Sequence, residues 1–559
     1  MMDELLTFSP IDHAMSQFLL ARSTLVGEQR EQLRSIILRL SAQLGAGDSC
    51  IHLSDPEREL LMDSGLLNEA GVAPLVMVNR RLYLYRYWAY EKALAQQLKD
   101  LVQSDCTIDD VDVLLEKYFP AIGDRTDWQR EAARRALSNS LTIITGGPGT
   151  GKTTTVVKIV SMLQELAHQN KKRLNIALAA PTGKAAMRLQ QSISHSTASL
   201  PCESSVRESI PNRVFTIHRM LGAKRYSPYF HHRADNPLPY DLVVVDEASM
   251  VDLALMSKLL DALRVGAKLI LLGDRNQLAS VESGAVLADL IEALPEQTAE
   301  LQESFRFDAG IKAVSEGVNR QQGAMVWDTL QQGEYSNISL MDSHAVTVVE
   351  RVYEKSLNYW QLIRDNGSFA DIVAAFNQFQ CLATNRVGSL GVTELNERIE
   401  GRLADAGFIE RGEIGRWYRG RPVIVNRNIP ELGLFNGDIG ITLYDADGNL
   451  KVYFEGGGDD SVDASSDDCI ATRHFIPSRI VHCETAYAMT VHKSQGSEFD
   501  EVLVVFPDVM NPVLTKELIY TAITRAKKGV QLAVSDEIWH ATVGQRIERH
   551  SGLVEMLIH

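Results

Sequence analysis

The residues best suited to chemistry begin with the run GGPGTGKT at 146–153, which lies between the apolar run LTIIT and the helical pattern TTTVVKIVSMLQEL. In a strand–loop–helix setting, glycines let backbone N–H groups turn inward around phosphate, Lys152 can reach the β- and γ-phosphates, and Thr153 can bind Mg²⁺. A chance glycine-rich turn is the alternative, and the flanking strand and helix argue against it. The predicted ligands are ATP and Mg²⁺, held by Gly146, Gly147, Pro148, Gly149, Thr150, Gly151, Lys152, Thr153 and Thr154.

Hydrolysis needs acidic residues, and the run VVVDEA at 243–248 supplies two of them. An apolar strand ending in Asp-Glu places Asp246 beside the magnesium and Glu247 where it could activate a water. Acids at strand ends are common, so this pair decides nothing alone. Together with the phosphate loop it indicates nucleoside triphosphate hydrolysis.

Further polar residues could complete such a site. Gln277 ends the run LLGDRNQ, from where it could sense the γ-phosphate or orient the attacking water, although a strand-terminating turn would also explain it. Arg306 and Arg525 are candidates for cations that stabilise the transition state, although most helical arginines are merely solvated. Gln129 could offer its amide to adenine, and a surface glutamine is the alternative.

One more stretch, TVHKSQGSEFD at 490–500, is almost entirely polar. A core segment would not have this composition. It is either an ordinary solvated loop or a surface where several hydrogen-bonding partners meet, and the stretch alone does not choose between them.

The elements that must position these residues follow a repeated pattern. Short apolar runs, at 141–146, 175–182, 242–248 and 268–274, each lead into a polar turn and then a helical stretch. This order is typical of a parallel sheet with crossover helices. The same pattern returns around QCLATN at 380–385 and EVLVVFP at 501–507, which predicts a second α/β unit.

Two other regions follow a different pattern of apolar and polar residues. Residues 1–115 show apolar residues at three- and four-residue steps and no catalytic constellation, which predicts a helical domain that docks partners. Alternating strands with hairpin signals at 421–457 predict a small all-β insert at about 400–480. The predicted domains are therefore 1–115, 116–305 and 306–559, with the insert in the last of them.

The composition of the 559 residues, 45% hydrophobic and 23% charged, is that of a soluble globular protein. There is no long apolar run, and the first residues have an early acidic pair and no basic leader, so we expect a cytoplasmic protein without membrane contact. The six cysteines include no C-x-x-C pair, which argues against zinc, iron–sulfur or disulfide frameworks. The net charge of −16 means that any contact with nucleic acid must be confined to a groove.

The motifs, taken in order, resemble those of superfamily 1 helicases, and within them the RecD branch, to which the α subunit of the RecBCD (exonuclease V) helicase–nuclease belongs. The resemblance spans residues 120–530. It is carried by Gln129, 146–153, APTGKAA (180–186), FTIHRML (215–221), VVVDEASM (243–250), GDRNQLASVESG (273–284), SFRF (304–307), TAYAMTVHKSQGSEFD (485–500) and LIYTAITRAKK (518–528). It implies an α/β fold of two RecA-like P-loop motor domains, with a helical N-terminal domain and a β-barrel-like (SH3-like) insert in the second motor domain.

By this resemblance the polar stretch touches both nucleotide and DNA. Gln495 and Gly496 would face the γ-phosphate, and Glu498 would face the ribose. The residues expected at the DNA backbone are Thr182, Lys184, Thr216, His218, Thr490, His492, Lys493 and Ser494. Threonine and histidine near helix starts also cap helices, so that alternative stays open for the first four.

The resemblance implies an ATP-dependent DNA helicase that translocates 5′-to-3′ on single-stranded DNA and processes double-strand ends for recombinational repair beside RecB-like and RecC-like subunits. A second reading is a regulatory subunit whose ATP site switches conformation with little unwinding of its own. Intact motor residues favour the first interpretation: Lys152, Asp246, Glu247, Gln277, Arg306 and Arg525. A third reading, a P-loop ATPase unrelated to DNA, is disfavoured by the full series of motifs.

Overall fold

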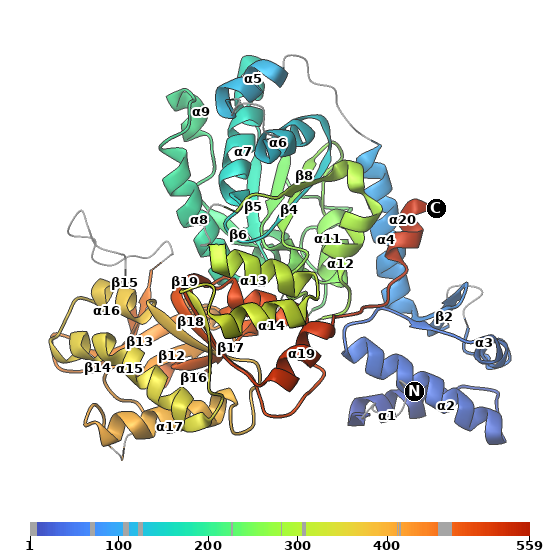
Figure 1. Cartoon of the computed structure of the whole chain (residues 1–559). Helices are drawn as coiled ribbons and strands as arrows, with labels where there is room; N and C mark the ends of the chain where they lie inside the picture. The colour runs from blue at the N-terminus through green and yellow to red at the C-terminus, as the bar shows by residue number, and fades with distance from the viewer. Residues whose placement is uncertain are drawn as a thin grey trace.

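The computed structural model describes residues 8–67, 73–103, 111–120, 127–224, 227–280, 282–304, 309–410, 412, 415–456 and 472–559. They form two parallel α/β sheets, an antiparallel five-stranded sheet and a small N-terminal sheet (Figure 1). The predicted α/β class with parallel sheets is confirmed. Among the described residues, no helix has the length and apolar character needed to cross a membrane.

The first parallel sheet has the strand order β6-β5-β7-β8-β4-β9. Its strands are β4 (Leu141–Gly146), β5 (Ile176–Ala180), β6 (Val214–Thr216), β7 (Leu242–Val245), β8 (Lys268–Gly273) and β9 (Thr298–Leu301). The central strands are buried throughout because helices cover both faces, which explains their continuous apolar runs. The carboxyl ends of β4, β7 and β8 meet at one edge, so the phosphate loop, Asp246 and Gln277 gather there.

Hydrophobic clusters lie on both faces of this sheet. The helices around it are α6 (Trp128–Ser138), α7 (Lys152–Gln169), α8 (Gly183–Thr197), α9 (Ser204–Glu208), α10 (Ile217–Leu221), α11 (Leu253–Asp261) and α12 (Val286–Ala293). Thr182 caps α8, because its hydroxyl accepts a hydrogen bond from Ala185 N at 3.2 Å. The cap fixes where α8 begins beside the nucleotide edge of the sheet.

The second parallel sheet has the order β10-β19-β18-β11-β17. Its strands are β10 (Ile338–Met341), β11 (Phe379–Ala383), β17 (Ala488–Thr490), β18 (Phe499–Val505) and β19 (Ala526–Ala533). Its helices are α13 (Ala309–Asn319), α14 (Gly323–Gln332), α15 (Ala345–Arg364), α16 (Phe369–Phe376), α17 (Val392–Asp405), α18 (Lys516–Ile523) and α19 (Asp536–Gly544). The polar stretch at 490–500 connects β17 to β18, which lie on opposite sides of β11.

An antiparallel sheet is inserted before β17, with the order β15-β14-β13-β12-β16. Its strands are β12 (Pro422–Val425), β13 (Ile439–Tyr444), β14 (Leu450–Glu455), β15 (Thr472–Phe475) and β16 (Cys483–Thr485). Val423, Val425, Val452 and Phe454 form its own small core. The sheet runs from 422 to 485, so the predicted window began inside α17 and ended before β16. Its SH3-like character stays a prediction.

The N-terminal region is mostly helical, but it also contains a sheet that the sequence pattern did not reveal. Its helices are α1 (Pro10–Leu20), α2 (Gly27–Gly45), α3 (Asp55–Met62), α4 (Tyr85–Val102) and α5 (Val111–Tyr118). The strands β1 (Ile51–His52), β3 (Arg81–Leu84) and β2 (Leu75–Val78) pair antiparallel, in that order. Leu94 of α4 and Leu115 of α5 belong to the clusters that flank the first parallel sheet. The part that packs apart from that sheet is therefore shorter than the predicted 1–115.

The last residues leave the second sheet and return to the first. We call residues 545–559 the C-terminal strap; it ends in α20 (Leu553–Ile558), which lies beside α4 and α12 (Figure 1). His550 N donates to Asp48 Oδ1 at 2.7 Å, and Gly552 N donates to Glu91 Oε2 at 3.1 Å. The strap therefore ties the N-terminal region, the first sheet and the end of the chain together.

Glu91 of α4 is a fully buried acid at this junction, and it also accepts a hydrogen bond from the Ser49 hydroxyl. Burial raises the pKa of Glu91 to about 7. Between the ordinary glutamate pKa and this value, the folded chain keeps a proton that the unfolded chain loses. The free energy of unfolding therefore falls as the pH rises through this window, by up to about 3 kcal/mol.

We expect Glu91→Gln to remove this loss, because the amide is neutral at every pH. Urea unfolding at pH 5 and pH 8 should show the variant gaining stability over the parent chain at the higher pH. The matched control is Glu59→Gln on α3, at an exposed position. Parallel pH profiles for the parent chain and Glu91→Gln would contradict the prediction.

Candidate nucleotide and DNA site

The phosphate loop follows β4 and leads into α7. Gly149 and Gly151 have φ angles of 77° and 81°, in the left-handed region that glycine adopts without strain. Lys152 Nζ donates to Gly146 O at 2.6 Å and to Gly147 O at 3.0 Å. The ammonium group thus lies folded over the loop at the positive end of α7, where a phosphate would take over these contacts.

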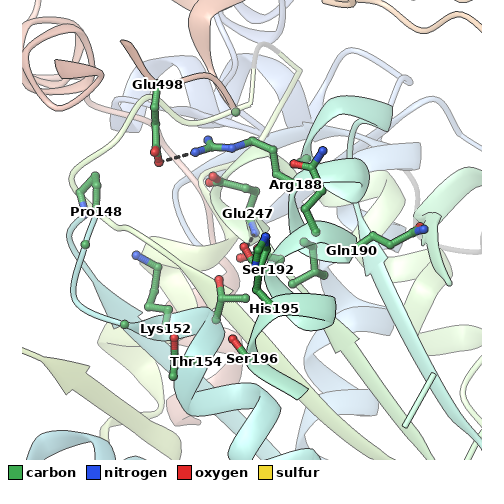
Figure 2. Close-up of a pocket in the computed structure, with 18 of the residues that line it drawn as sticks. Pro148, Lys152, Thr154, Arg188, Gln190, Ser192, His195, Ser196, Glu247 and Glu498 are labelled. Atoms are coloured by element: carbon green, nitrogen blue, oxygen red, sulfur yellow. Dashed lines mark hydrogen bonds and ion pairs between the residues drawn. The ribbon is translucent and has the colours of Figure 1, made fainter. Parts of the chain in front are cut away.

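A cavity of about 1040 Å³ opens beside this loop, which is large enough for a nucleotide (Figure 2). It brings together residues from the two parallel-sheet units. The predicted residues that line it are Gln129, Pro148, Gly149, Gly151, Lys152, Thr153, Thr154, Asp246, Glu247, Gln277, Gly496, Glu498 and Arg525. Four further predicted residues lie next to the cavity without lining it: Gly146, Gly147, Thr150 and Gln495.

Gln129 is fixed against the phosphate loop. Asp127 caps α6 by accepting hydrogen bonds from Gln129 N and Arg130 N, both at 3.0 Å. The side-chain Nε2 of Gln129 donates to Thr150 O at 3.1 Å. A Cβ at Gly151 would come within 2.5 Å of that nitrogen, so both the φ angle and the space require glycine there. The glutamine amide therefore faces the nucleotide cavity from a rigid position.

Asp246 and Glu247 follow β7 as predicted. Glu247 has a φ of 52°, and its backbone N donates to Asp246 Oδ1 at 2.9 Å. Burial, and then the neighbouring Glu247 carboxylate, raise the pKa of Asp246 to about 6. A desolvated carboxylate pair of this kind is stabilised by a divalent cation, and Thr153 lines the same cavity. The residues present therefore fit Mg²⁺ bound together with a triphosphate.

Four side chains form a hydrogen-bonded chain across the cleft. Arg525 Nη2 donates to Gln277 Oε1 at 3.0 Å, and Gln277 Nε2 donates to Asp274 Oδ2 at 3.1 Å. Tyr520 on α18 donates its hydroxyl to the same Asp274 oxygen at 3.0 Å. Because Asp274 accepts from the amide nitrogen, the amide oxygen of Gln277 is turned toward Arg525. Gln277 and Arg525 were predicted from the sequence, whereas Asp274 and Tyr520 were not, although both lie inside the helicase-like motifs.

Arg306 lies outside the described residues. Just before it, Ser304 donates its hydroxyl to Pro148 O of the phosphate loop at 3.2 Å. Ser304 therefore lies directly beside the phosphate loop.

The polar stretch at 490–500 makes contacts on several sides. Gln495 Nε2 donates to Leu278 O of the first unit at 3.2 Å. Lys493 Nζ donates to Asn426 Oδ1 at 2.7 Å and pairs with Glu484 at the edge of the inserted sheet. Thr490 Oγ1 accepts from Lys493 N at 3.3 Å, and His492 is partly buried. The stretch is therefore a junction between three parts of the molecule and not a free solvated loop.

Ser494 differs from its predicted setting. Its side chain is fully buried and donates to Val491 O at 2.7 Å, because residues 492–494 form a tight 3-10 turn. In this conformation the Ser494 hydroxyl is buried and does not face a DNA strand.

The other predicted DNA residues stand at the starts of two helices, α8 and α10, which follow the paired strands β5 and β6. Thr182 and Thr216 both cap helices, the latter by accepting from Arg219 N at 3.3 Å, so the capping alternative is realised for both. Lys184 is in contact with the inserted sheet through Gly437 O at 3.5 Å, and burial lowers its pKa to about 8. His218 packs against Phe230 at 5.7 Å between ring centroids. Their DNA-binding role stays a prediction.

One wall of the cavity comes from α8, whose polar face the sequence analysis did not use. Arg188, Gln191, Ser192 and His195 line it, together with Ser196 (Figure 2). Their spacing of three to four residues places them on one side of a helix, and this periodicity in MRLQQSISH could have revealed the wall.

The fold and this cleft define a P-loop nucleoside triphosphatase of the helicase class. A family model for an AAA domain matches residues 129–283, and one for a UvrD-like helicase C-terminal domain matches residues 485–533. The RecBCD enzyme subunit RecD of Haemophilus influenzae is 34% identical over 544 residues, covering 87% of this chain and 81% of that protein. The RecBCD enzyme subunit RecD of Mycobacterium tuberculosis is 36% identical over 564 residues, covering 95% and 92%. The chain therefore belongs to the RecD family.

A more distant relative is the ATP-dependent RecD2 DNA helicase of Deinococcus radiodurans, 29% identical over 499 residues, which cover 85% of this chain and 58% of that protein. The predicted enzyme class, an ATP-dependent DNA helicase, is confirmed for this chain by the family to which it belongs.

We expect Tyr520→Phe to slow ATP turnover about tenfold, because a hydrogen bond to a buried carboxylate contributes about 1.5–3 kcal/mol and orients Gln277 through Asp274. Steady-state turnover with single-stranded DNA measures this effect, and fluorescent ADP binding should change less than about twofold, since Tyr520 does not line the cavity. Tyr444→Phe, at an exposed tyrosine of the inserted sheet, is the control. An unchanged turnover rate in Tyr520→Phe would rule out the positioning role.

Proposed function

We propose that this chain is the cytoplasmic 5′-to-3′ translocating subunit of a RecBCD-type complex that processes double-strand DNA ends for recombinational repair. RecB-like and RecC-like subunits are its proposed partners, and single-stranded DNA is its track. One observation carries the proposal: a single nucleotide-sized cavity is lined by Lys152 and Asp246 from one parallel-sheet unit and by Arg525 from the other. The names of the relatives support the assembly, and the polarity rests on the resemblance.

In the proposed mechanism, the residues of the cleft change partners around ATP. Lys152 leaves the carbonyl oxygens of its own loop for the β- and γ-phosphates. Thr153 and Asp246 would hold Mg²⁺, which would supply charge to neutralise the phosphates. Glu247 accepts the proton of the attacking water, and Gln277 orients that water. The Gln129 amide forms hydrogen bonds with the adenine base.

Arginine residues of the second unit supply the remaining charge. Arg525 stabilises the charge of the transition state, and Arg306 is a second candidate for this role. Arg525 is now hydrogen-bonded to Gln277, so both side chains must turn toward the phosphate together. A nucleotide that draws them over would also change how the two units face each other.

The polar stretch can couple that change to DNA. Lys493 is bound to Glu484 and Asn426 at the inserted sheet, while Gln495 reaches the first unit. A shift between the units would move the stretch that Gln495 ties to the first unit. That movement would strain the contacts of Lys493 with Glu484 and Asn426 and free Lys493 for a phosphate of the DNA strand. Thr490 and His492 lie in the same stretch, and Thr182, Lys184, Thr216 and His218 are proposed to extend the track along the first unit. Ser494 would need the turn to open.

The net charge of −16 limits what this chain can do with DNA on its own. Sequence-independent binding depends on lysine and arginine at the phosphates. The proposed contact is therefore a narrow track, and the partner subunits share the rest of the DNA path. The alternative function, an ATP switch with little unwinding, uses the same cleft and differs in whether DNA changes the rate of hydrolysis.

The first test is ATP turnover by the full chain with and without single-stranded DNA. We expect stimulation of at least tenfold, and we expect Lys152→Ala to abolish it, because this lysine is the ammonium group nearest the phosphate loop. Lys172→Ala, at an exposed position shortly after the end of α7, is the control that should retain stimulation.

If the isolated chain shows no stimulation, the measurement is repeated with RecB-like and RecC-like subunits from the same source. Stimulation that depends on Lys152 in that complex supports the motor. ATP binding without stimulation in either setting would overturn it in favour of the switch.

A further inference from the structure

We propose that Arg188 is a third cation of the triphosphate site, held by Glu498 until a γ-phosphate takes its guanidinium group. This arginine would then let the cleft distinguish ATP from ADP. It lies on α8, outside the residues that the sequence analysis assigned to nucleotide binding. The inference rests on the proposed function in one respect, that the nucleotide occupies the cavity beside the phosphate loop.

Arg188 stands where two cavities meet. It lines both the nucleotide cavity and an adjoining cavity of about 350 Å³, and Glu498 lines the same two. The two side chains form an ion pair, so they make the partition between the cavities. Figure 2 shows this pair spanning the cavity near Glu247, with Lys152 on the opposite side. The pair also joins the two units, because α8 belongs to the first and Glu498 precedes β18 of the second.

The charge of Arg188 changes the pKa values of residues at the hydrolytic site. Its guanidinium group lowers the pKa of Asp246 against the effect of burial, as Lys152 also does. It also acts on Arg525, whose pKa is lowered first by burial. Three cations, Lys152, Arg188 and Arg525, thus surround the acidic pair at the place where the γ-phosphate is expected. A planar guanidinium group is well suited to a phosphate because it donates two parallel hydrogen bonds.

The present partner of Arg188 can be exchanged at low cost. The Arg188 side chain is 35% exposed and the Glu498 side chain is 14% exposed, so water reaches the arginine side of the pair and lowers the cost of its release. When Arg188 turns away, Glu498 still has Lys527, whose Nζ lies 3.8 Å from it. The carboxylate is therefore not left as an unpaired buried charge, which would be strongly unfavourable.

Only a triphosphate can make Arg188 exchange the Glu498 carboxylate for a phosphate. ADP ends at the β-phosphate, which Lys152 and the loop bind, so the pair between Arg188 and Glu498 stays intact in its presence. ATP adds a group with up to two negative charges, which competes with the single charge of Glu498. Breaking the pair removes one link between the two units at the moment when Arg525 and Gln277 also move to the phosphate.

The test is the binding of ADP and of a non-hydrolysable ATP analogue to the full chain and to Arg188→Ala. We expect the variant to bind the analogue about tenfold more weakly, the usual worth of one charge-assisted contact, and to bind ADP within about twofold of the parent chain. Lys528→Ala is the matched control, because it removes a nearby cation that pairs with Asp500 and lies outside the nucleotide cavity. Its ratio of the two affinities should equal that of the parent chain.

Equal weakening of both nucleotides in Arg188→Ala, or no weakening of either, would overturn the inference. A parent chain that binds neither nucleotide would instead overturn the proposed function. The thermal unfolding midpoint of each variant checks that a loss of binding is not a loss of folding.

Glu498→Gln gives a second, independent readout. Removing the charge that holds Arg188 should raise the affinity for the ATP analogue relative to that for ADP about twofold, the equivalent of about half a kcal/mol. Equal weakening of ADP and the analogue would mean that Glu498 touches the ribose, as the resemblance implies, and would reject the exchange.

Discussion

The hydrogen bond between Arg525 and Gln277 is the contact on which the rest of the cleft depends. Arg525 is 3% exposed, and a buried guanidinium group is strongly unfavourable unless its donors are satisfied. Its own unit satisfies two of them, through Thr521 O at 3.1 Å and Ser497 O at 3.4 Å. The remaining partner is Gln277 of the other unit. Across the cleft the guanidinium group is therefore bound to a neutral amide, which is a weaker partner for a cation than a phosphate would be.

This arrangement explains why the cleft combines rigid and exchangeable contacts. The phosphate loop, Asp246 and Gln277 stand on the carboxyl ends of fully buried parallel strands, so their positions are fixed by close packing. The cations that face them, Lys152, Arg188 and Arg525, are each bound to a carbonyl, a carboxylate or an amide that another anion can replace. The acids and the loop are thus preorganised, while the cations keep their charges satisfied until a nucleotide arrives.

The parts of this design that the sequence could reveal are local. The phosphate loop, the acids after β7 and the parallel strands were predictable because each depends on a short run and its neighbours. Asp274, Tyr520 and Arg188 were missed because their roles depend on partners hundreds of residues away, which no periodicity reports.

The same limit explains the differences in the fold. The hairpin of β2 and β3 depends on a left-handed turn at Asn79 between short runs, too brief for a strand pattern to be distinctive. The sequence of the C-terminal strap has the pattern of an ordinary short terminal helix. Only tertiary contacts reveal that the strap returns to α4.

The segment from Asp274 to Gly284 connects these distant parts. On one side, Leu278 N donates to Thr521 Oγ1 at 3.0 Å. On the other, Arg549 of the strap donates to Gly284 O at 3.1 Å, and Gly284 N donates to Gly47 O after α2 at 2.8 Å. Separate hydrogen bonds therefore join this part of the chain to the second unit and to the N-terminal region. If the nucleotide moves Gln277 as proposed, a partner bound to the N-terminal region would act on the same segment, and by linkage the nucleotide would act on that partner in return. The motor and switch functions thus share one physical element, and a subunit of a larger helicase can serve both.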